Sequence, residues 1–423
     1  MAKDALDPTR YPTFPPPETD PTTLASLSTY LVMIAVEEYE RERDIVIKTM
    51  EDRVYALSAY NNKLDTDAEQ EIEAVREGFN HNLAVLQTLL FPPLSYSSSL
   101  PSPTPTPAPH HSPSSPQPLQ SSSSYTLLPQ IITHLSREYT TVVPASYSYL
   151  TSKLDLDSGR APKILIPGAG LGRLAYEVLK KLPNATVELN EFSVPMATAL
   201  SRIIHNGLTV DIFSHVQSSA TVGEVSSKNR LQKVQVSVLP LPQNSQLSLT
   251  TGDFVTCYST PLNTNNAYDY ILTSYILDAV PNIIEMILII KKLALNSRSQ
   301  NIKTAWCNYG PLHWHNGVEL KLSVDEIKDI LTKEGFVIDE WEIVVGEAYR
   351  NDVDEAMFMT DELYNCLKFC VTLDDSKEFE DDIISRIEEG RRQIKEKKDL
   401  EIVNANEDDP EEEEESTMRI EEL

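Results

Sequence analysis

The sequence is poor in the residues that define several classes of protein. Four cysteines, 13 glycines and three tryptophans among 423 residues exclude collagen and a disulfide scaffold. No CxxC pair is present, so we expect no metal site. No apolar run reaches the ~18 residues of a membrane-spanning helix, and the first 20 residues lack the apolar stretch of a secretory signal. We therefore expect a cytoplasmic protein with reduced thiols and no membrane partner.

Basic residues are scarce beside acidic ones. The chain has 36 Lys and Arg against 64 Asp and Glu, a formal charge of −28 at pH 7. The electrostatic field of so negative a chain repels polyanions, so we expect no nucleic-acid partner. The run RRQIKEKK at 391–398 is a candidate nuclear-localisation patch, with a solvated helix face as the alternative.

Composition divides the chain into five regions. Residues 1–21 and 93–124 are Pro- and Ser-rich and have little to bury, so we expect a disordered arm and a disordered linker. Residues 22–92 place apolar side chains at helical spacing, which predicts a helical hairpin that packs on another surface. Residues 125–374 show the alternation of predicted strands and helices that is typical of an α/β domain. Residues 375–423 predict a charged helix and an acidic tail, too polar to join a core.

Within 125–374, short β-rich runs alternate with helical ones. The expected strands lie at 163–167, 185–189, 268–274, 303–309, 336–345 and near 365–373. Repeated strand-then-helix segments predict an α/β fold with a doubly wound parallel sheet. The polar stretch at about 210–250 carries few such signals, and we interpret it as an insertion.

The most informative segment is ILIPGAGLGRLAY at 164–176. A predicted strand ends, three glycines follow, and a helix opens. Gly168, Gly170 and Gly172 permit a tight turn and the close approach of a ligand to free helix N–H groups. The spacing is not the GxGxxG of dinucleotide binding, which counts against a nicotinamide dehydrogenase. The alternative is a glycine-rich turn without a ligand.

An acidic residue follows the second predicted strand. Glu191 lies 19 residues beyond Gly172, a distance that fits a carboxylate bound to a ribose diol. Glu188, three residues earlier, is the rival for this role.

Two further segments follow strands and carry polar groups. Asp253 could accept a hydrogen bond from an adenine amino group while the Phe254 ring covers the base, although a plain turn is the alternative. Ser274, Tyr275 and Asp278 come at or just past the end of the strand at 268–274, where open α/β sheets bind ligands. Asp278 could instead cap a helix that starts near Pro281.

Together, the motifs resemble those of the carnosine N-methyltransferase family. The resemblance rests on LIPGAGLGRLAYEV, NEFSVPM, GDF, ILDAVPN and NYGPLHWH, and covers most of residues 22–373. It implies a Rossmann-like methyltransferase fold, S-adenosylmethionine as cofactor, and methylation of the imidazole of carnosine or a related His dipeptide to an anserine-type product. A homodimer is compatible with the sequence. The alternatives are a protein or another metabolite as substrate, or an inactive fold that binds partners.

The resemblance also implies roles for individual residues. It assigns cofactor binding to His134, Arg137, Gly168, Gly170, Gly172, Glu191, Asp253, Phe254 and Ser274. It assigns substrate binding to Asp278, His315, Tyr349 and Tyr364, with Asp278 and His315 as catalytic residues. Arg137 would pair with the cofactor carboxylate, and His134 stands where the family has a Gln. Asp278 would accept from one imidazole N–H and so activate the other ring nitrogen.

Overall fold

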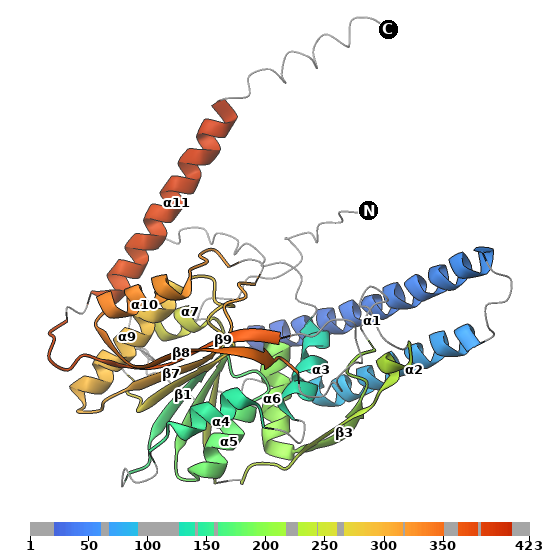
Figure 1. The fold of residues 1–423 in the computed structure, drawn as a ribbon, viewed down its shortest axis with the longest axis horizontal. Coiled ribbons are helices and arrows are strands. Elements are labelled where there is room, and N and C mark those ends of the chain that lie inside the picture. Colours follow the sequence, from blue (N-terminus) through green and yellow to red (C-terminus); the bar gives the residue numbers. More distant parts are fainter. Residues whose placement is uncertain are drawn as a thin grey trace, which may run out of the picture.

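The computed structural model places most of the chain in one α/β arrangement (Figure 1). The described residues are 21–60, 67–91, 127–139, 143–155, 160–216, 227–242, 244–259, 266–315, 318–350, 363–379 and 382–407. The arm, the Ser/Pro linker and the acidic tail from residue 408 lie outside the described residues, apart from Pro21, the first residue of α1. Within these ranges all four cysteines are free. None of the helices described is long and apolar enough to cross a membrane.

The centre of the molecule is a seven-stranded sheet with the order β5-β2-β1-β6-β7-β9-β8. Its strands are β1 (Lys163–Pro167), β2 (Thr186–Glu191), β5 (Gln246–Thr251), β6 (Tyr270–Ser274), β7 (Ala305–Gly310), β8 (Phe336–Ala348) and β9 (Leu363–Leu373). The strands from β5 to β7 are parallel, and β9 runs antiparallel to both β7 and β8. The six predicted strands are confirmed.

Strand β5 corrects one boundary of the insertion interpreted at about 210–250, because residues from Gln246 onward belong to the central sheet. It pairs in parallel with β2 along its whole length and forms one edge of the sheet. An edge strand buries its side chains only partly, and here none of the six residues is fully buried. It therefore lacks the apolar run that marks the central strands. Ahead of β5, the antiparallel hairpin of β3 (Leu208–Ile212) and β4 (Val234–Val238) forms a separate small sheet, with the 3₁₀ turn η2 (Ser227–Leu231) before β4.

Helices cover both faces of the central sheet, as a doubly wound fold requires. One face packs against α4 (Ala145–Ser152), α5 (Arg173–Lys181) and α6 (Val194–Asn206). The other face packs against α7 (Phe254–Ser259), α9 (Ile283–Ser299) and α10 (Val324–Lys333). In β1, Ile164 and Ile166 belong to the first core and Leu165 to the second, because successive strand side chains point to opposite faces.

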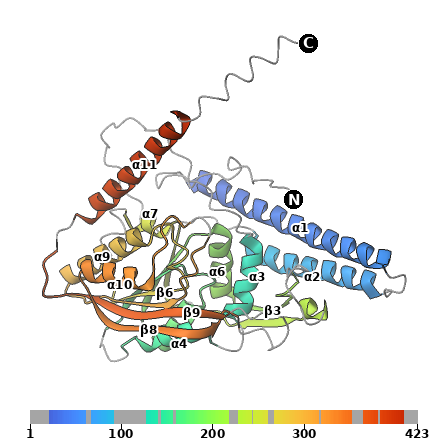
Figure 2. The same cartoon turned by 45° about the horizontal axis from the view of Figure 1, so that its top comes forward.

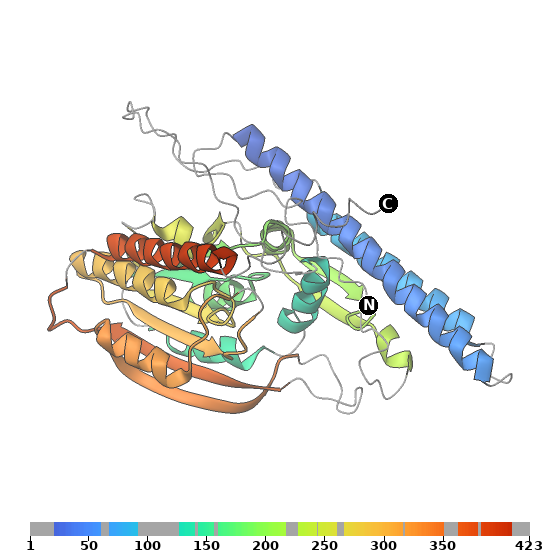
Figure 3. The ribbon, with the colours of Figure 1, turned by 90° about the horizontal axis from the view of Figure 1, so that it is seen from above.

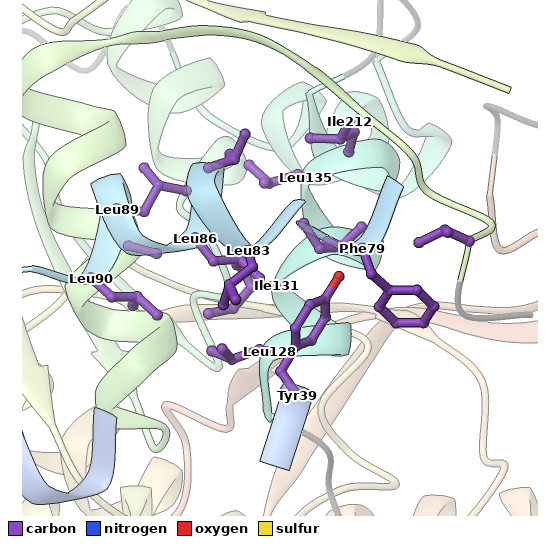
Figure 4. Packing of buried hydrophobic residues seen from close by; sticks show 14 of the residues in the cluster. Tyr39, Phe79, Leu83, Leu86, Leu89, Leu90, Leu128, Ile131, Leu135 and Ile212 are labelled. Carbon is purple, nitrogen blue, oxygen red and sulfur yellow. The ribbon is translucent and has the colours of Figure 1, made fainter. Parts of the chain in front are cut away.

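The predicted helical hairpin consists of α1 (Pro21–Tyr60) and α2 (Asp67–Leu90), which run side by side in Figures 2 and 3. With α3 (Leu127–Glu138), these helices form a third core against α6 and the β3–β4 hairpin. Figure 4 shows Tyr39 of α1, Phe79 and Leu86 of α2, and Ile131 of α3 meeting there. This core fixes α3, the helix that carries His134 and Arg137.

Helix α11 (Ile383–Glu407) corrects the expectation that the C-terminal region is too polar to join a core. Ile383 and Ile387 are 0% and 4% exposed and lie in the core beside α9. Arg386 and Arg391 form ion pairs with Glu334 of the α10 end and Glu285 of α9. Two apolar residues one helical turn apart bury a narrow stripe, even in a helix that is charged elsewhere.

Candidate cofactor and substrate site

The glycine loop, residues 168–172, joins β1 to α5. Gly168, Gly170 and Gly172 have φ values of +65°, +57° and +88°, a region that side-chain-bearing residues rarely adopt. A Cβ on Gly170 would lie 2.6 Å from the Glu138 Oε1 atom and 3.2 Å from the His134 Nδ1 atom. The loop therefore needs glycine both for its backbone shape and for the approach of α3.

The two candidate ribose ligands on β2 occupy different places. The Glu191 carboxylate, 8% exposed, accepts a hydrogen bond from the Gly170 N–H at 2.9 Å. Burial raises its pKa, and bonds from the Gly170 and Ser193 amides oppose the rise. Glu188 accepts instead from two tyrosine hydroxyls, at 2.7 and 2.8 Å, on the α7 side of the sheet. Glu191 is thus the carboxylate beside the loop.

A cavity lies between α3, the glycine loop and the end of β6. Five of the predicted cofactor residues line it: His134, Arg137, Gly168, Gly170 and Ser274. The Ser274 hydroxyl is buried and has no hydrogen-bond partner among the described residues. A buried hydroxyl without a partner is costly, so this atom fits a site that a polar ligand completes.

Arg137 is a buried cation at the border of this cavity. It is 4% exposed, and its guanidinium carbon lies 4.1 Å from the Tyr275 ring centre and 4.5 Å from that of Tyr349. Its Nη1 atom donates to the Tyr349 hydroxyl at 3.2 Å. Burial acts to lower its pKa, whereas nearby tyrosines and the Glu138 carboxylate raise it overall; that carboxylate forms its ion pair with His134. A buried guanidinium whose hydrogen bond goes to a neutral tyrosine hydroxyl fits an anionic ligand group such as the cofactor carboxylate.

The GDF segment lies outside the cavity wall. The Asp253 Oδ1 atom accepts from the Thr256 N–H at 2.8 Å, so it caps α7 rather than forming a plain turn. Phe254 is 3% exposed, and its ring centre lies 4.9 Å from that of Tyr258 in the core beneath α7. Neither residue lines the cavity, and the expectation that the Phe254 ring covers the adenine base stays a prediction.

Asp278 follows the carboxyl end of β6 and is 2% exposed. Its Oδ2 atom accepts from the His313 N–H at 2.9 Å, and its carbonyl accepts from the His315 N–H at 3.0 Å. Burial raises the pKa of the carboxyl group, while the His313 amide and the His315 imidazole oppose the rise. The helix-cap alternative is wrong, because the side chain of Asn282 caps α9.

Five rings form a continuous series that we call the aromatic row: Tyr275, Tyr349, Tyr364, His313 and His315. Their successive ring centres are 5.7, 5.6, 5.6 and 6.5 Å apart. The row runs from Arg137 at the cofactor cavity to the loop that Asp278 holds. The structure therefore brings the four predicted substrate residues into one region beside the cofactor cavity.

Two residues of the site were given no specific role from the sequence, although Tyr275 was placed at the ligand-binding edge of the sheet. Tyr275 follows Ser274 directly, and its φ of +54°, unusual for a non-glycine residue, places its ring over Arg137. The position of Tyr275 directly after a predicted strand indicated that it could contact a ligand. Glu138 accepts hydrogen bonds from the Leu171 and Arg173 amides, at 3.3 Å each. Nothing in its local sequence distinguishes it from a solvated helix residue.

The strand order, the glycine loop after β1 and the carboxylate at the end of β2 define a Rossmann-like methyltransferase. A family model described as carnosine N-methyltransferase matches residues 111–375. The chain belongs to this family, whose cofactor is S-adenosylmethionine.

Curated relatives carry the same description. The mouse (Mus musculus) carnosine N-methyltransferase is 28% identical over 221 residues, which are 49% of this chain and 50% of that protein. The Drosophila melanogaster protein carnosine N-methyltransferase unmet is 30% identical over 191 residues, 42% and 38% of the two chains. The chain thus spans about half the length of the curated relatives it matches. Among solved structures, the Haemonchus contortus phosphoethanolamine N-methyltransferase 2 is 13% identical, with 54% and 52% coverage and a TM-score of 0.34.

Proposed function

We propose that this chain transfers the methyl group of S-adenosylmethionine to an imidazole nitrogen of carnosine or a related His dipeptide. The observation that carries the proposal is the position of Asp278. Its buried carboxylate lies beyond the carboxyl end of β6, bonded to the loop of His313 and His315. The aromatic row connects this loop to Arg137 at the cofactor cavity. A flat, polar ring such as imidazole suits such surroundings.

Methyl transfer depends more on the alignment of the two reacting groups than on acid–base catalysis. Methyl transfer is an in-line displacement in which a ring nitrogen attacks the sulfonium methyl and the thioether leaves. An imidazole is mostly neutral at pH 7, so no base has to remove a proton before attack. Asp278 accepts from the ring N–H, which leaves the opposite nitrogen as the nucleophile. Its charge also favours the transition state, because positive charge moves from sulfur to the ring.

The residues of the cofactor cavity fit S-adenosylmethionine, which supplies an activated methyl group. Arg137 would hold its carboxylate, and the unpartnered Ser274 hydroxyl offers a further polar contact. Each carboxylate oxygen has two lone pairs, so Glu191 can hold the loop and still accept from a ribose hydroxyl. The left-handed glycines leave the backbone open to the methionine part.

A methyl-transfer assay with labelled S-adenosylmethionine tests the proposal. The purified chain is offered carnosine, other His dipeptides and a protein extract, and the methylated nitrogen is located by NMR. We expect label on the imidazole of a dipeptide. Label confined to protein would favour the alternative substrate class. Tight binding of NAD without binding of S-adenosylhomocysteine would exclude a methyltransferase.

We also propose that the protein acts in the cytoplasm. In the structure, Arg391 pairs with Glu285 and Arg392 with Glu389 and Glu396, which supports the solvated-face interpretation of 391–398. A fusion to a fluorescent protein tests this proposal, and we expect its signal in the cytoplasm. A nuclear signal that is lost in the Arg391→Ala/Arg392→Ala double variant would overturn the proposal.

A further inference from the structure

Glu138, at the end of α3, is a buried carboxylate for which the proposed reaction has no use. It is 1% exposed. Its Oε1 atom lies 2.6 Å from His134 Nδ1 and accepts from the Leu171 N–H at 3.3 Å. Its Oε2 atom accepts from the Arg173 N–H, also at 3.3 Å. One carboxylate thus joins α3 to the glycine loop and to the first residue of α5.

The start of α5 needs such a partner. Its N-cap is Gly172, which has no side chain to accept from the first free N–H groups. A carboxylate at a helix N-terminus both accepts these bonds and complements the helix dipole. Glu138 therefore supplies, from another helix, the cap that the glycine cannot provide. The Tyr139 hydroxyl adds a bond to the Leu171 carbonyl at 2.7 Å.

Two carboxylates share the work of holding the loop. Glu191, on β2, accepts a hydrogen bond from the Gly170 N–H. Glu138, on α3, accepts from the Leu171 and Arg173 amides. Glycines lose more backbone freedom on ordering than other residues, so three of them in five positions make this loop costly to fix. Without the α3 contacts, the loop would lose two of its anchors.

The same carboxylate is bonded to His134, one turn earlier on α3. An ionised carboxylate can only accept, so the proton of the contact sits on His134 Nδ1 and the Nε2 atom is left for another partner. Both His134 and Glu138 are among the residues that line the cofactor cavity. Glu138 thus sets the orientation of a cavity residue as well as the shape of the loop.

We propose that Glu138 is a positioning residue for the cofactor: it caps α5, fixes the glycine loop in its binding shape and orients His134. This inference rests on the proposed function, because it concerns the same S-adenosylmethionine site. It assigns Glu138 no contact with reacting atoms. Its effect belongs to cofactor affinity, and a role in folding alone would leave that affinity unchanged.

The test is Glu138→Gln in the full chain, with S-adenosylhomocysteine binding measured by calorimetry in the absence of any substrate. Glutamine has the same shape, but its NH₂ group must face either His134 or a backbone N–H, so one bond is lost. Loss of a charge-assisted hydrogen bond corresponds to an affinity about 10- to 100-fold weaker. The matched control is Glu177→Gln on α5, whose carboxylate accepts from Arg173 Nε at 2.7 Å. We expect the control to bind like wild type.

Folded Glu138→Gln protein with wild-type affinity, or with the same loss as Glu177→Gln, would overturn the inference. If Glu138→Gln does not fold, His134 variants test the same carboxylate. We expect His134→Ala to lose affinity several-fold and His134→Gln, whose amide can donate to Glu138, to recover it. Wild-type affinity in His134→Ala would then overturn the inference. Absence of binding by the wild-type chain would overturn the proposed function and this inference with it.

Discussion

The cofactor end of the site is formed largely by backbone, whereas the substrate end is formed by side chains. At the cofactor end, the Gly170 amide donates to Glu191, and the Leu171 and Arg173 amides donate to Glu138. At the substrate end, rings from four separate segments stand beside the Asp278 loop. The first arrangement cannot accept a Cβ. The substrate end tolerates replacement of one ring by another of similar size, but it depends on the charge and orientation of the Asp278 carboxylate.

The two ends meet at Arg137. Its guanidinium borders the cofactor cavity, and the rings of Tyr275 and Tyr349 stack against it. Tyr349 in turn contacts Tyr364 of the aromatic row. Substitutions on either side of Arg137 should therefore separate into those that change cofactor affinity and those that change turnover.

Gly170→Val should have the largest effect, the abolition of cofactor binding. Residue 170 has a φ of +57°, and a Cβ there would meet Glu138 Oε1 at 2.6 Å. The control is Gly390→Val in α11, where no atom lies within 4 Å of the added Cβ. Calorimetry with S-adenosylhomocysteine measures both. Binding by Gly170→Val within a few-fold of wild type would remove the glycine loop from the site.

Glu191→Ala should weaken cofactor binding by roughly 1.5–3 kcal/mol, the cost of a charge-assisted hydrogen bond. Burial raises the pKa of Glu191, so wild-type affinity should fall as the pH drops through a value above the ordinary carboxyl range. The Ala variant should lack that step. Glu188→Gln is the comparison, because Glu188 bonds to tyrosines on the α7 side. We expect Glu188→Gln to change the stability of the protein and to leave cofactor affinity unaltered. If the pH dependence of affinity persists in Glu191→Ala, it arises from another titratable group.

Tyr349→Phe should have a smaller effect, about 0.5–1.5 kcal/mol on cofactor or substrate binding. It removes the hydroxyl that accepts from Arg137 at 3.2 Å and keeps the ring stacked on the guanidinium. Titrations with cofactor and with dipeptide show which end depends on the bond. Tyr349→Ala, which also removes the ring, should lose more; equal losses in both variants would contradict a role for the stacking.

Ile387→Ala should have the smallest effect on the site and a clear effect on stability. Ile387 is 4% exposed in the core beside α9, so its truncation should lower the free energy of unfolding by about 2–5 kcal/mol. Cofactor affinity below the unfolding temperature should match wild type. Denaturant unfolding and calorimetry on one preparation test this. Unchanged stability would mean that α11 does not belong to the core.

The same contrast explains what the sequence could predict. The strand, glycine loop and helix at 164–176 are continuous in the chain, so their local pattern reports their geometry. The central strands are recognisable because both faces are buried. Strand β5 is half-exposed at an edge, and its six residues show no such run.

The substrate end was predictable only in part, because its members come together through tertiary packing. His313, Tyr349 and Tyr364 lie on different segments, and the antiparallel pairing of β8 and β9 brings the two tyrosines together. The resemblance named Asp278, His315, Tyr349 and Tyr364, whereas residue patterns alone left Asp278 open between substrate contact and helix cap. Glu138 acts across space on a loop 33 residues away, a contact that no local pattern encodes.

Asp278→Asn provides the most direct test of the account, through kcat/KM for carnosine together with S-adenosylhomocysteine affinity. Asparagine keeps an oxygen for the His313 N–H but lacks the charge that favours a ring becoming cationic. The loss of a positioned electrostatic partner predicts a fall of ~10²–10³ in kcat/KM with unchanged cofactor affinity. Wild-type kcat/KM in the folded variant would contradict the account and leave Asp278 as a tether of the His313–His315 loop alone.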